Sequence, residues 1–512
     1  MLSTRLVTGL PRLAWCATVT RGSPQVQLVH GETVEVVGDT FIAGAWDGPF
    51  AKLGLFDATT VMGSGGRATD RHVAFCNATH PYDDIYSVRV DDAMHVSNSL
   101  PLLLAHTDDG PDINYRKYQG DRVKAWRLGT AASPVPVPTR LSREVLIHTG
   151  TDLTVSRDLE LTSTDKPIPP EPHGFAEYRT MLAGAVRGVI ENASDRARHH
   201  PLRTLSTLSS GYDAAVGAVL GAEAGLKDAI SFTKPGPDSD SGKPMGEVLG
   251  LHVVEYDTQA WRHLSSEPEI EFAASASGTS HPTFAVLDDG WNNSLVLHGS
   301  LGDDIWDVIV GDWGEGLSQP GAGLFSPAGL HEYALRAGVV FFAVPTIGAV
   351  HFEEIRRITE SDEMAPWIIG VPYERPIPRR IIEEAGVPRG SFATHKRATA
   401  QVPTDGLLGP DAAADFERFW HAARASQTPA RRLAWRIETA TLVPLMARSN
   451  TILFKIRGLL RVRKWLREWM RHRAVPQAYR FHWAVNRLID RYASELRAAP
   501  PDSRPEVPAD SL

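Results

Sequence analysis

Two short segments of this chain carry residue types that bind phosphate groups. The first, residues 209–213 (SSGYD), is a small polar turn between an apolar stretch at 202–208 and a small-residue helical pattern at 214–224. A strand, a turn and a helix in this order point backbone N–H groups and the positive helix end at one spot, which suits a phosphate. Asp213 in such a turn can hold Mg²⁺ that arrives with a nucleotide. An ordinary strand–helix turn without a ligand fits the same pattern.

The second segment, residues 295–307 (LVLHGSLGDDIWD), reads as an apolar strand that ends in a glycine-containing turn with two carboxylates. Magnesium favours oxygen ligands from one or two carboxylates together with substrate phosphates. Asp303 or Asp304 therefore suits a second magnesium ligand opposite Asp213. The same carboxylates also suit the first turn of a helix, where acidic side chains cap free N–H groups.

Two further groups could act on a substrate. Glu332 and Tyr333 stand next to each other in a stretch, 328–345, that predicts a helix followed by an apolar strand. They could form an acid–base pair near an incoming amine, although a solvated Glu on a helix face is the simpler interpretation. Lys396, with Arg397 beside it, suits a mobile phosphate contact because its ammonium is flexible. An ordinary basic pair on the surface is the alternative.

These residues need a scaffold that brings distant turns together. A helix is predicted over 175–192, and β-branched apolar runs at 228–233 (DAISFT) and 251–257 (LHVVEYD) predict strands. Strands that alternate with helices at this spacing predict a doubly wound parallel sheet. Such sheets bind ligands beyond the carboxyl ends of their strands, which is where the 209–213 turn would lie.

The predicted fold class is multi-domain α/β, in three parts. Residues 1–170 read as a β-rich, sandwich-like domain, and the Pro-rich stretch 166–172 marks its boundary. Within it, Gly-rich residues 62–70 predict a hairpin or a surface loop rather than a phosphate loop. Residues 175–410 form the predicted α/β domain, and 411–512 form a basic helical region.

The turn at 209–213 resembles the pyrophosphatase loop (PP-loop) of the asparagine-synthetase-like ATP-dependent ligases, whose pattern is S-G-G-x-D-S. Ser210 stands at a glycine of that pattern, and Ala214 stands at its last serine. One side-chain donor to pyrophosphate is therefore missing. In the same family a segment S-G-x-G-[SG]-D-E-L-F follows later in the chain. The turn after the apolar strand at 295–298 is similar to that segment, since its glycines and its first aspartate match, whereas His298 and Leu301 do not.

The resemblance implies a domain like the adenine nucleotide α-hydrolases, with ATP and Mg²⁺ as cofactors. The implied nucleotide-binding residues are Leu208, Ser209, Ser210, Gly211, Asp213, Phe232, Gly299 and Gly302. The implied magnesium ligands are Asp213 and Asp303. Lys396 is implied to steady the charge that develops during adenylation, with Glu332 and Tyr333 as the acid–base candidates.

The implied reaction starts when a substrate carboxylate attacks the α-phosphate of ATP, which releases pyrophosphate and forms an acyl-adenylate. Ammonia or an amine then displaces AMP and gives an amide. The partners implied are thus a carboxylate substrate and an ammonia or amine donor. Positioning and preorganised charge are the main resources that such chemistry requires.

The N-terminal domain contains the segments 46–51 (WDGPFA) and 86–105 (YSVRVDDAMHVSNSLPLLLA) in this order. This order resembles a degenerate form of the glutamine amidotransferase domain that precedes the synthetase domain in this family. A glutaminase of that class needs a cysteine as the first residue of the mature chain, because its α-amino group serves as the base for its own thiol. Removal of Met1 here would expose Leu2, and Cys16 and Cys76 are internal. We therefore expect no glutamine hydrolysis, and we expect both cysteines to be small buried apolar residues.

The cysteine count and the distribution of charge further limit the kinds of site and partner that this protein can have. Two cysteines in 512 residues build neither a disulfide framework nor a zinc site, and they fit a reducing cytoplasm. The net charge of −8 argues against general nucleic-acid binding, and we expect no specific nucleic-acid partner. Residues 431–496 are basic with interleaved Trp, so they could contact an anionic membrane at its inner face or an acidic partner. They could also bind nucleic acid nonspecifically, or pack on their own domain. The sequence leaves the oligomeric state open.

A second hypothesis belongs to another class. Ser210 and Ala214, which depart from the PP-loop pattern, could mark a catalytically degraded relative. Such a protein could still bind a nucleotide or be wholly inactive, and it would act as a scaffold, with its basic C-terminal helices as the region that holds it at a membrane.

Overall fold

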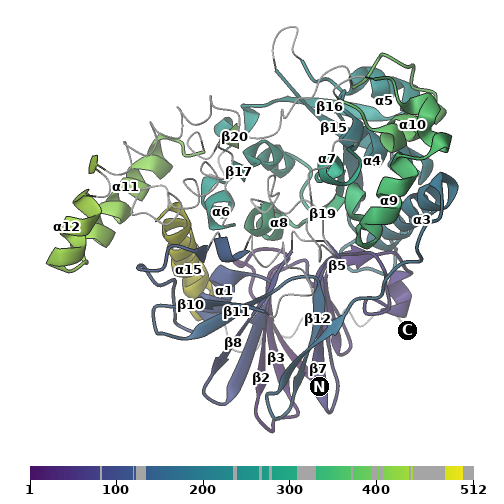
Figure 1. Ribbon diagram of the computed structural model, residues 1–512. Helices are drawn as coiled ribbons and strands as arrows, with labels where there is room; N and C mark the ends of the chain where they lie inside the picture. Colours follow the sequence, from purple (N-terminus) through teal and green to yellow (C-terminus); the bar gives the residue numbers. More distant parts are fainter. Residues whose placement is uncertain are drawn as a thin grey trace.

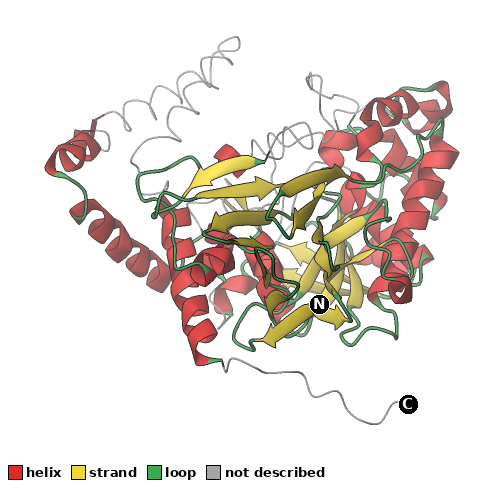
Figure 2. Cartoon of the chain, turned by 90° about the horizontal axis from the view of Figure 1, so that it is seen from below, coloured by secondary structure: helices red, strands yellow, loops and turns green. Residues whose placement is uncertain are grey.

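The computed structural model describes residues 1–80, 83–118, 120–122, 134–234, 239–264, 268–275, 279–307, 330–370, 373–393, 402–403, 407–437, 440–441 and 479–499. Within them the protein is a mixed α/β structure with several sheets, one of them parallel (Figure 1). Strands gather at the centre of the molecule and helices lie on both sides of them (Figure 2).

The N-terminal part consists of two mainly antiparallel sheets. The first has seven strands in the order β1-β3-β2-β9-β8-β11-β10. Its strands are β1 (Leu2–Leu6), β2 (Trp15–Thr20), β3 (Val26–His30), β8 (Ile85–Val90), β9 (Ala93–Ser97), β10 (Val135–Pro138) and β11 (Glu144–His148). The second has six strands in the order β13-β12-β7-β6-β5-β4. Its strands are β4 (Glu35–Val37), β5 (Thr40–Trp46), β6 (Val61–Ala68), β7 (His72–Cys76), β12 (Thr151–Ser156) and β13 (Leu161–Asp165).

Aromatic side chains join these two sheets face to face. The ring of Trp15 on β2 stacks on Phe75 of β7 at 5.8 Å and meets Phe41 of β5 edge-on at 4.9 Å. Large aromatic rings in such contacts stabilise a core beyond the area that they bury. The predicted β-rich layer is therefore present. The Gly-rich 62–70 segment forms a hairpin, one of its two predicted structures, because most of it is the largely buried strand β6, which pairs antiparallel with β7.

The second part is built on a parallel sheet with the strand order β16-β15-β14-β18-β19. Its strands are β14 (Arg203–Thr207), β15 (Asp228–Thr233), β16 (His252–Asp257), β18 (Ser294–His298) and β19 (Val339–Ala343). The predicted strand at 228–233 has the same bounds as β15, and the predicted helix at 175–192 lies within α3 (Phe175–Ala193). The chain order reverses between β14 and β18, which makes the space beyond their carboxyl ends the topological switch point of the sheet.

Helices and short 3₁₀ turns cover both faces of the parallel sheet. Leu295 and Leu297 of β18 pack with α3 and α4 (Tyr212–Glu223), whereas Val296 packs on the other face. That other face is covered by η3 (Ala260–His263), α6 (Glu269–Ala274), η4 (Pro282–Asp288) and α8 (His331–Ala337). The alternation follows from the strand period of two, which sends successive side chains to opposite faces.

The remaining elements are shorter or peripheral. They are η1 (Phe50–Lys52), α1 (Leu100–His106), α5 (Lys243–Leu249), β17 (Thr279–Ser280), α7 (Gly302–Ile305), η6 (Val344–Thr346), η7 (Ala349–His351), α9 (Phe352–Thr359), η8 (Asp362–Trp367), α10 (Pro376–Glu384), β20 (Val402–Pro403), α11 (Pro410–Ala425), α12 (Pro429–Ile437) and α15 (Arg480–Ala498). Ser99 caps α1 by accepting a hydrogen bond from the backbone N–H of Leu102.

The C-terminal helix α15 packs against α1 and α6, so it joins the two parts of the molecule (Figure 1). Its Trp483 is fully buried and its Arg491 forms an ion pair with Glu271 at 2.9 Å. This end of the basic region therefore packs on its own chain, while residues 442–478 lie outside the described residues. Of the helices in the described part of the chain, none is long and apolar enough to cross a membrane.

Candidate functional site at the switch point of the parallel sheet

The first predicted turn links β14 to α4, as the sequence indicates. Gly211 is the N-cap of α4, and its N–H donates to Ser209 Oγ at 3.1 Å. Ser210 donates to Asp240 Oδ1 both from its backbone N–H, at 3.2 Å, and from its hydroxyl, at 2.6 Å. Hydrogen bonds within the turn and to Asp240, in the loop after β15, thus fix the turn at the N-terminal end of α4.

The second predicted turn, between β18 and α7, lies against the first. A Cβ atom at Gly299 would overlap the backbone of Asp213, and one at Gly302 would overlap the Asp213 carboxyl group. Both glycines are therefore required by the close approach of the two turns. The structure brings the 209–213 turn, Gly299, Gly302 and Asp303 to one place at the switch point.

Arg375, which was not among the residues predicted from the sequence, lies at the centre of this site. Its side chain is 0% exposed, and its Nη1 atom donates to Asp213 Oδ1. Its Nη2 atom lies 3.7 Å from Asp307 Oδ2. Burial lowers the pKa of the guanidinium, but the charges of Asp213, Tyr373 and Asp303 outweigh this and leave the pKa above its usual value. Arg375 is therefore a permanent cation among carboxylates.

Aromatic side chains surround the ion pair. The rings of Tyr212 and Tyr373 lie 5.0 Å apart, and the Arg375 guanidinium lies 5.0 Å from the ring centre of Tyr373. Arg379, also buried, donates to the Tyr212 hydroxyl. Cation–π contacts of this kind add to the charge attraction that holds buried guanidinium groups.

The fit of these residues to a resident magnesium ion is poor. Within the described residues, no group of three or more His, Cys, Asp or Glu is arranged to hold a metal. Asp213 Oδ1 already accepts from Arg375, and the charge of Asp303 acts on the same guanidinium. A divalent cation between Asp213 and Asp303 would therefore meet a buried positive charge. Their role as magnesium ligands stays a prediction.

Glu332 and Tyr333 lie on the face of the sheet opposite α4. Glu332 is buried and its Oε2 accepts from the hydroxyl of Ser99 at 2.9 Å, so it does not lie on a solvated helix face. Burial raises the pKa of this carboxyl group. The Tyr333 hydroxyl donates to the carbonyl of Phe284 at 3.0 Å. Both side chains thus make structural contacts on α8, away from the β14–α4 turn.

The other predicted residues have these places. Leu208 is buried, and its N–H donates to the carbonyl of Ile230. The ring of Phe232 lies in a buried cluster, with its centre 5.3 Å from the ring centre of Phe284. Lys396 and Arg397 lie outside the described residues. The segment that leads to them does reach the site, since the N–H of Ala393 donates to the carbonyl of Ser210 at 2.7 Å.

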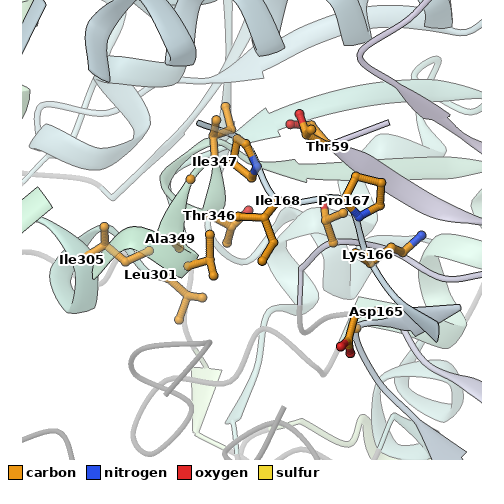
Figure 3. Close-up of a pocket in the computed structure, with 16 residues that line it drawn as sticks. Thr59, Asp165, Lys166, Pro167, Ile168, Leu301, Ile305, Thr346, Ile347 and Ala349 are labelled. Atoms are coloured by element: carbon orange, nitrogen blue, oxygen red, sulfur yellow. The ribbon is translucent and has the colours of Figure 1, made fainter. Parts of the chain in front are cut away.

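A cavity of about 260 Å³ lies between the N-terminal sheets and α7 (Figure 3). Leu301 and Ile305 line it from the β18–α7 side, and Ile168, which is 63% exposed, lies at its edge. Lys166 also lines the cavity but is paired with Asp152 at 2.6 Å. An engineered apolar cavity of about 150 Å³ holds benzene, so the space here could hold a small apolar group.

Both cysteines are fully buried free thiols, as expected. Burial raises the pKa of Cys16 far above its usual value, and burial, opposed by the nearby charge of Lys166, raises that of Cys76 to about 12. Neither thiol forms a reactive thiolate at neutral pH, because only a lowered pKa would supply one.

Comparison of the chain with protein-family models and with curated proteins found no match.

Proposed function

We propose that this chain is an ATP-dependent carbon–nitrogen ligase, similar to asparagine synthetases, that adenylates a carboxylate and passes the acyl group to ammonia or an amine. The observation that carries the proposal is the meeting of two turns at the switch point of the parallel sheet. Gly299 and Gly302 of the second turn lie directly against Asp213 of the first. Two glycine-bearing turns beyond the carboxyl ends of adjacent strands suit a nucleotide.

In the proposed reaction the 209–213 turn and the positive end of α4 hold the phosphates that leave as pyrophosphate. Lys396, which follows Ala393 in the sequence, is the candidate residue for contact with the α-phosphate. Magnesium enters with ATP, and Asp213 and Asp303 are its candidate ligands, so it must compete with Arg375 for Asp213. Both cysteines are buried within the N-terminal sheets, so the proposal gives neither of them a role in glutamine hydrolysis. The nitrogen then comes from free ammonia or from an amine.

The test compares one substitution at two glycines. Gly302→Ala would place a methyl group on the Asp213 carboxyl group, whereas a Cβ at Gly184 of α3 meets nothing within 4 Å. By calorimetry, we expect Gly302→Ala to bind ATP about tenfold more weakly than wild type, because the added methyl group displaces the turn that holds the phosphates. Gly184→Ala should bind ATP as wild type does. Wild-type protein that binds no ATP, with or without magnesium, would rule out the ligase.

The second candidate is a nucleotide-binding relative without catalysis. The ion pair between Arg375 and Asp213 favours it, because it engages a carboxylate that the ligase would use for magnesium. Ala214 also lacks the hydroxyl group of the family pattern. Pyrophosphate release in a screen of carboxylates and amines separates the two. Release that Gly302→Ala abolishes supports the ligase, and ATP binding without release from any substrate pair supports the second candidate.

We place the protein in a reducing compartment such as the cytoplasm, because both of its cysteines are free thiols. Contact with a membrane or an acidic partner through residues 431–496 would have to use the part before α15, since α15 packs on its own chain.

A further inference from the structure

Asp213 and Arg375 form an ion pair beneath the 209–213 turn. The guanidinium is 0% exposed, whereas the side chain of Asp213 is 23% exposed. The Nε and Nη2 atoms of Arg375 are buried and make no hydrogen bond to a described residue. Buried donors without an acceptor keep their full desolvation cost. The one hydrogen bond that the guanidinium makes to a described residue is therefore the bond from Nη1 to Asp213 in the turn, with Asp307 as a more distant ion-pair partner 3.7 Å from Nη2.

This charge changes what the end of α4 can bind. A carboxylate in the first turn of a helix interacts favourably with the positive helix end and therefore competes with any anionic ligand there. Asp213 stands in that first turn. Arg375 cancels its negative charge from the buried side, so the helix end and the turn stay available to a phosphate on the exposed side.

The same geometry leaves little room for a metal at Asp213. Oδ1 accepts the bond from Arg375, and the Cα of Gly302 lies so close that a Cβ there would overlap the carboxyl group. A metal ion would have to displace the guanidinium into a position where nothing neutralises it. Breaking a buried ion pair in this way is strongly unfavourable.

We propose that the Asp213–Arg375 ion pair, in place of a divalent metal, prepares this turn for phosphate. The site would then bind inorganic pyrophosphate, or the pyrophosphate part of a nucleotide, without Mg²⁺. The proposal rests on the nucleotide site proposed above. Arg375 acts as a positioning residue, because it is buried beneath Asp213 and reaches the ligand only through the field at the turn.

The test is calorimetric titration of the full chain with inorganic pyrophosphate, once in EDTA and once in excess MgCl₂. The variant is Arg375→Gln. The matched control is Arg380→Gln, which removes the same charge within α10, the helix that Arg375 caps. Arg380 pairs with Glu363 and Glu384, two carboxylates that do not belong to the site. Circular dichroism shows whether each variant is folded.

We expect wild type and Arg380→Gln to bind pyrophosphate equally in EDTA and in MgCl₂. Arg375→Gln should bind about tenfold more weakly in EDTA, because the charge of Asp213 is then exposed to the ligand, and should recover part of the loss in MgCl₂. Wild-type binding that requires Mg²⁺, wild type that does not bind, or a folded Arg375→Gln that binds like wild type in EDTA would overturn the proposal.

A second variant keeps the test decisive if Arg375→Gln does not fold. Asp213→Asn removes the negative charge and leaves Arg375 in place, so pyrophosphate should bind at least as tightly in EDTA as to wild type. A tenfold loss in MgCl₂, as expected for a metal ligand, or a tenfold loss in EDTA would contradict the proposal. Pyrophosphate that binds where ATP does not would end the ligase proposal alone, whereas ATP that binds only with Mg²⁺ would end this one alone.

Discussion

The side chain of Asp213 contacts both the turn after β18 and Arg375. Its carboxyl group fills the space that side chains at Gly299 and Gly302 would need, and it accepts from Arg375. The sequence predicted that Asp213 and the two glycines belong to one site, because both segments have a motif. It did not predict Arg375, since an arginine between Glu374 and Pro376 carries no local signal for the place of its side chain.

His298, at the carboxyl end of β18, gives a residue-level prediction of pH dependence. Burial lowers its pKa to about 3, so the folded protein keeps it neutral, whereas the unfolded chain protonates it near pH 6.5. Between these values the unfolded state binds more protons, and the free energy of unfolding therefore falls as the pH falls. The contribution of this one group is about 1.4 kcal/mol per pH unit.

Denaturant titrations between pH 6 and pH 4.5 check this expectation, with His298→Gln as the variant. The free energy of unfolding of the variant should fall less steeply with decreasing pH than that of wild type, by about the slope of one group. Parallel curves for the two proteins would show that His298 titrates alike in the folded and unfolded states.

At the scale of elements, the short helix α7 separates two environments. Leu301 and Ile305 face the cavity between the parts of the molecule, while Gly302 faces Asp213. Residues four apart share a helix face, and the residue next to them points elsewhere. Whatever fills the cavity therefore packs against the same turn that supports the candidate phosphate site.

The helix α15 supports a prediction at this scale. Trp483 is fully buried, and its indole N–H donates to Asp415 of α11 at 2.8 Å. We expect Trp483→Ala to cost about 3–5 kcal/mol of unfolding free energy through the cavity that it leaves. Arg497→Ala, at an exposed position of the same helix, should stay within about 0.5 kcal/mol of wild type. Urea unfolding followed by circular dichroism measures both variants. A loss of unfolding free energy well below this range in Trp483→Ala would mean that α15 can detach from the rest of the protein at little cost in free energy.

At the scale of the whole molecule, one apolar cluster runs through both parts. It includes Trp15 and Phe75 of the N-terminal sheets, Tyr212 and Val216 of α4, and Trp483 of α15. Elements that share a continuous core lose their packing together, since each buried face loses its partner when the other unfolds.

We therefore expect differential scanning calorimetry to show a single transition in which the calorimetric and van't Hoff enthalpies agree. Two separate peaks, one of which disappears in a variant with a disrupted N-terminal core such as Trp15→Ala, would show instead that the parts unfold independently.

The sequence by itself determined the local elements around the site. The β-branched run at 228–233 is β15, the small-residue pattern after Gly211 is α4, and the Pro-rich stretch after β13 leads to α3. Each of these follows from side-chain period, β-branching or turn chemistry, which act within a few residues. The meeting of the two turns was predictable as well, because parallel strands bring their carboxyl ends to one edge of a sheet.

Only the tertiary structure decided which charges face each other. Arg375 meets Asp213 across 162 positions of the chain, and Glu332 accepts a hydrogen bond from Ser99, 233 positions away. Such pairs depend on how whole layers pack, and packing at crystal-like density leaves each side chain one set of neighbours that no local pattern encodes. Local chemistry thus fixes where a turn forms, and long-range packing fixes the electrostatic environment in which it works.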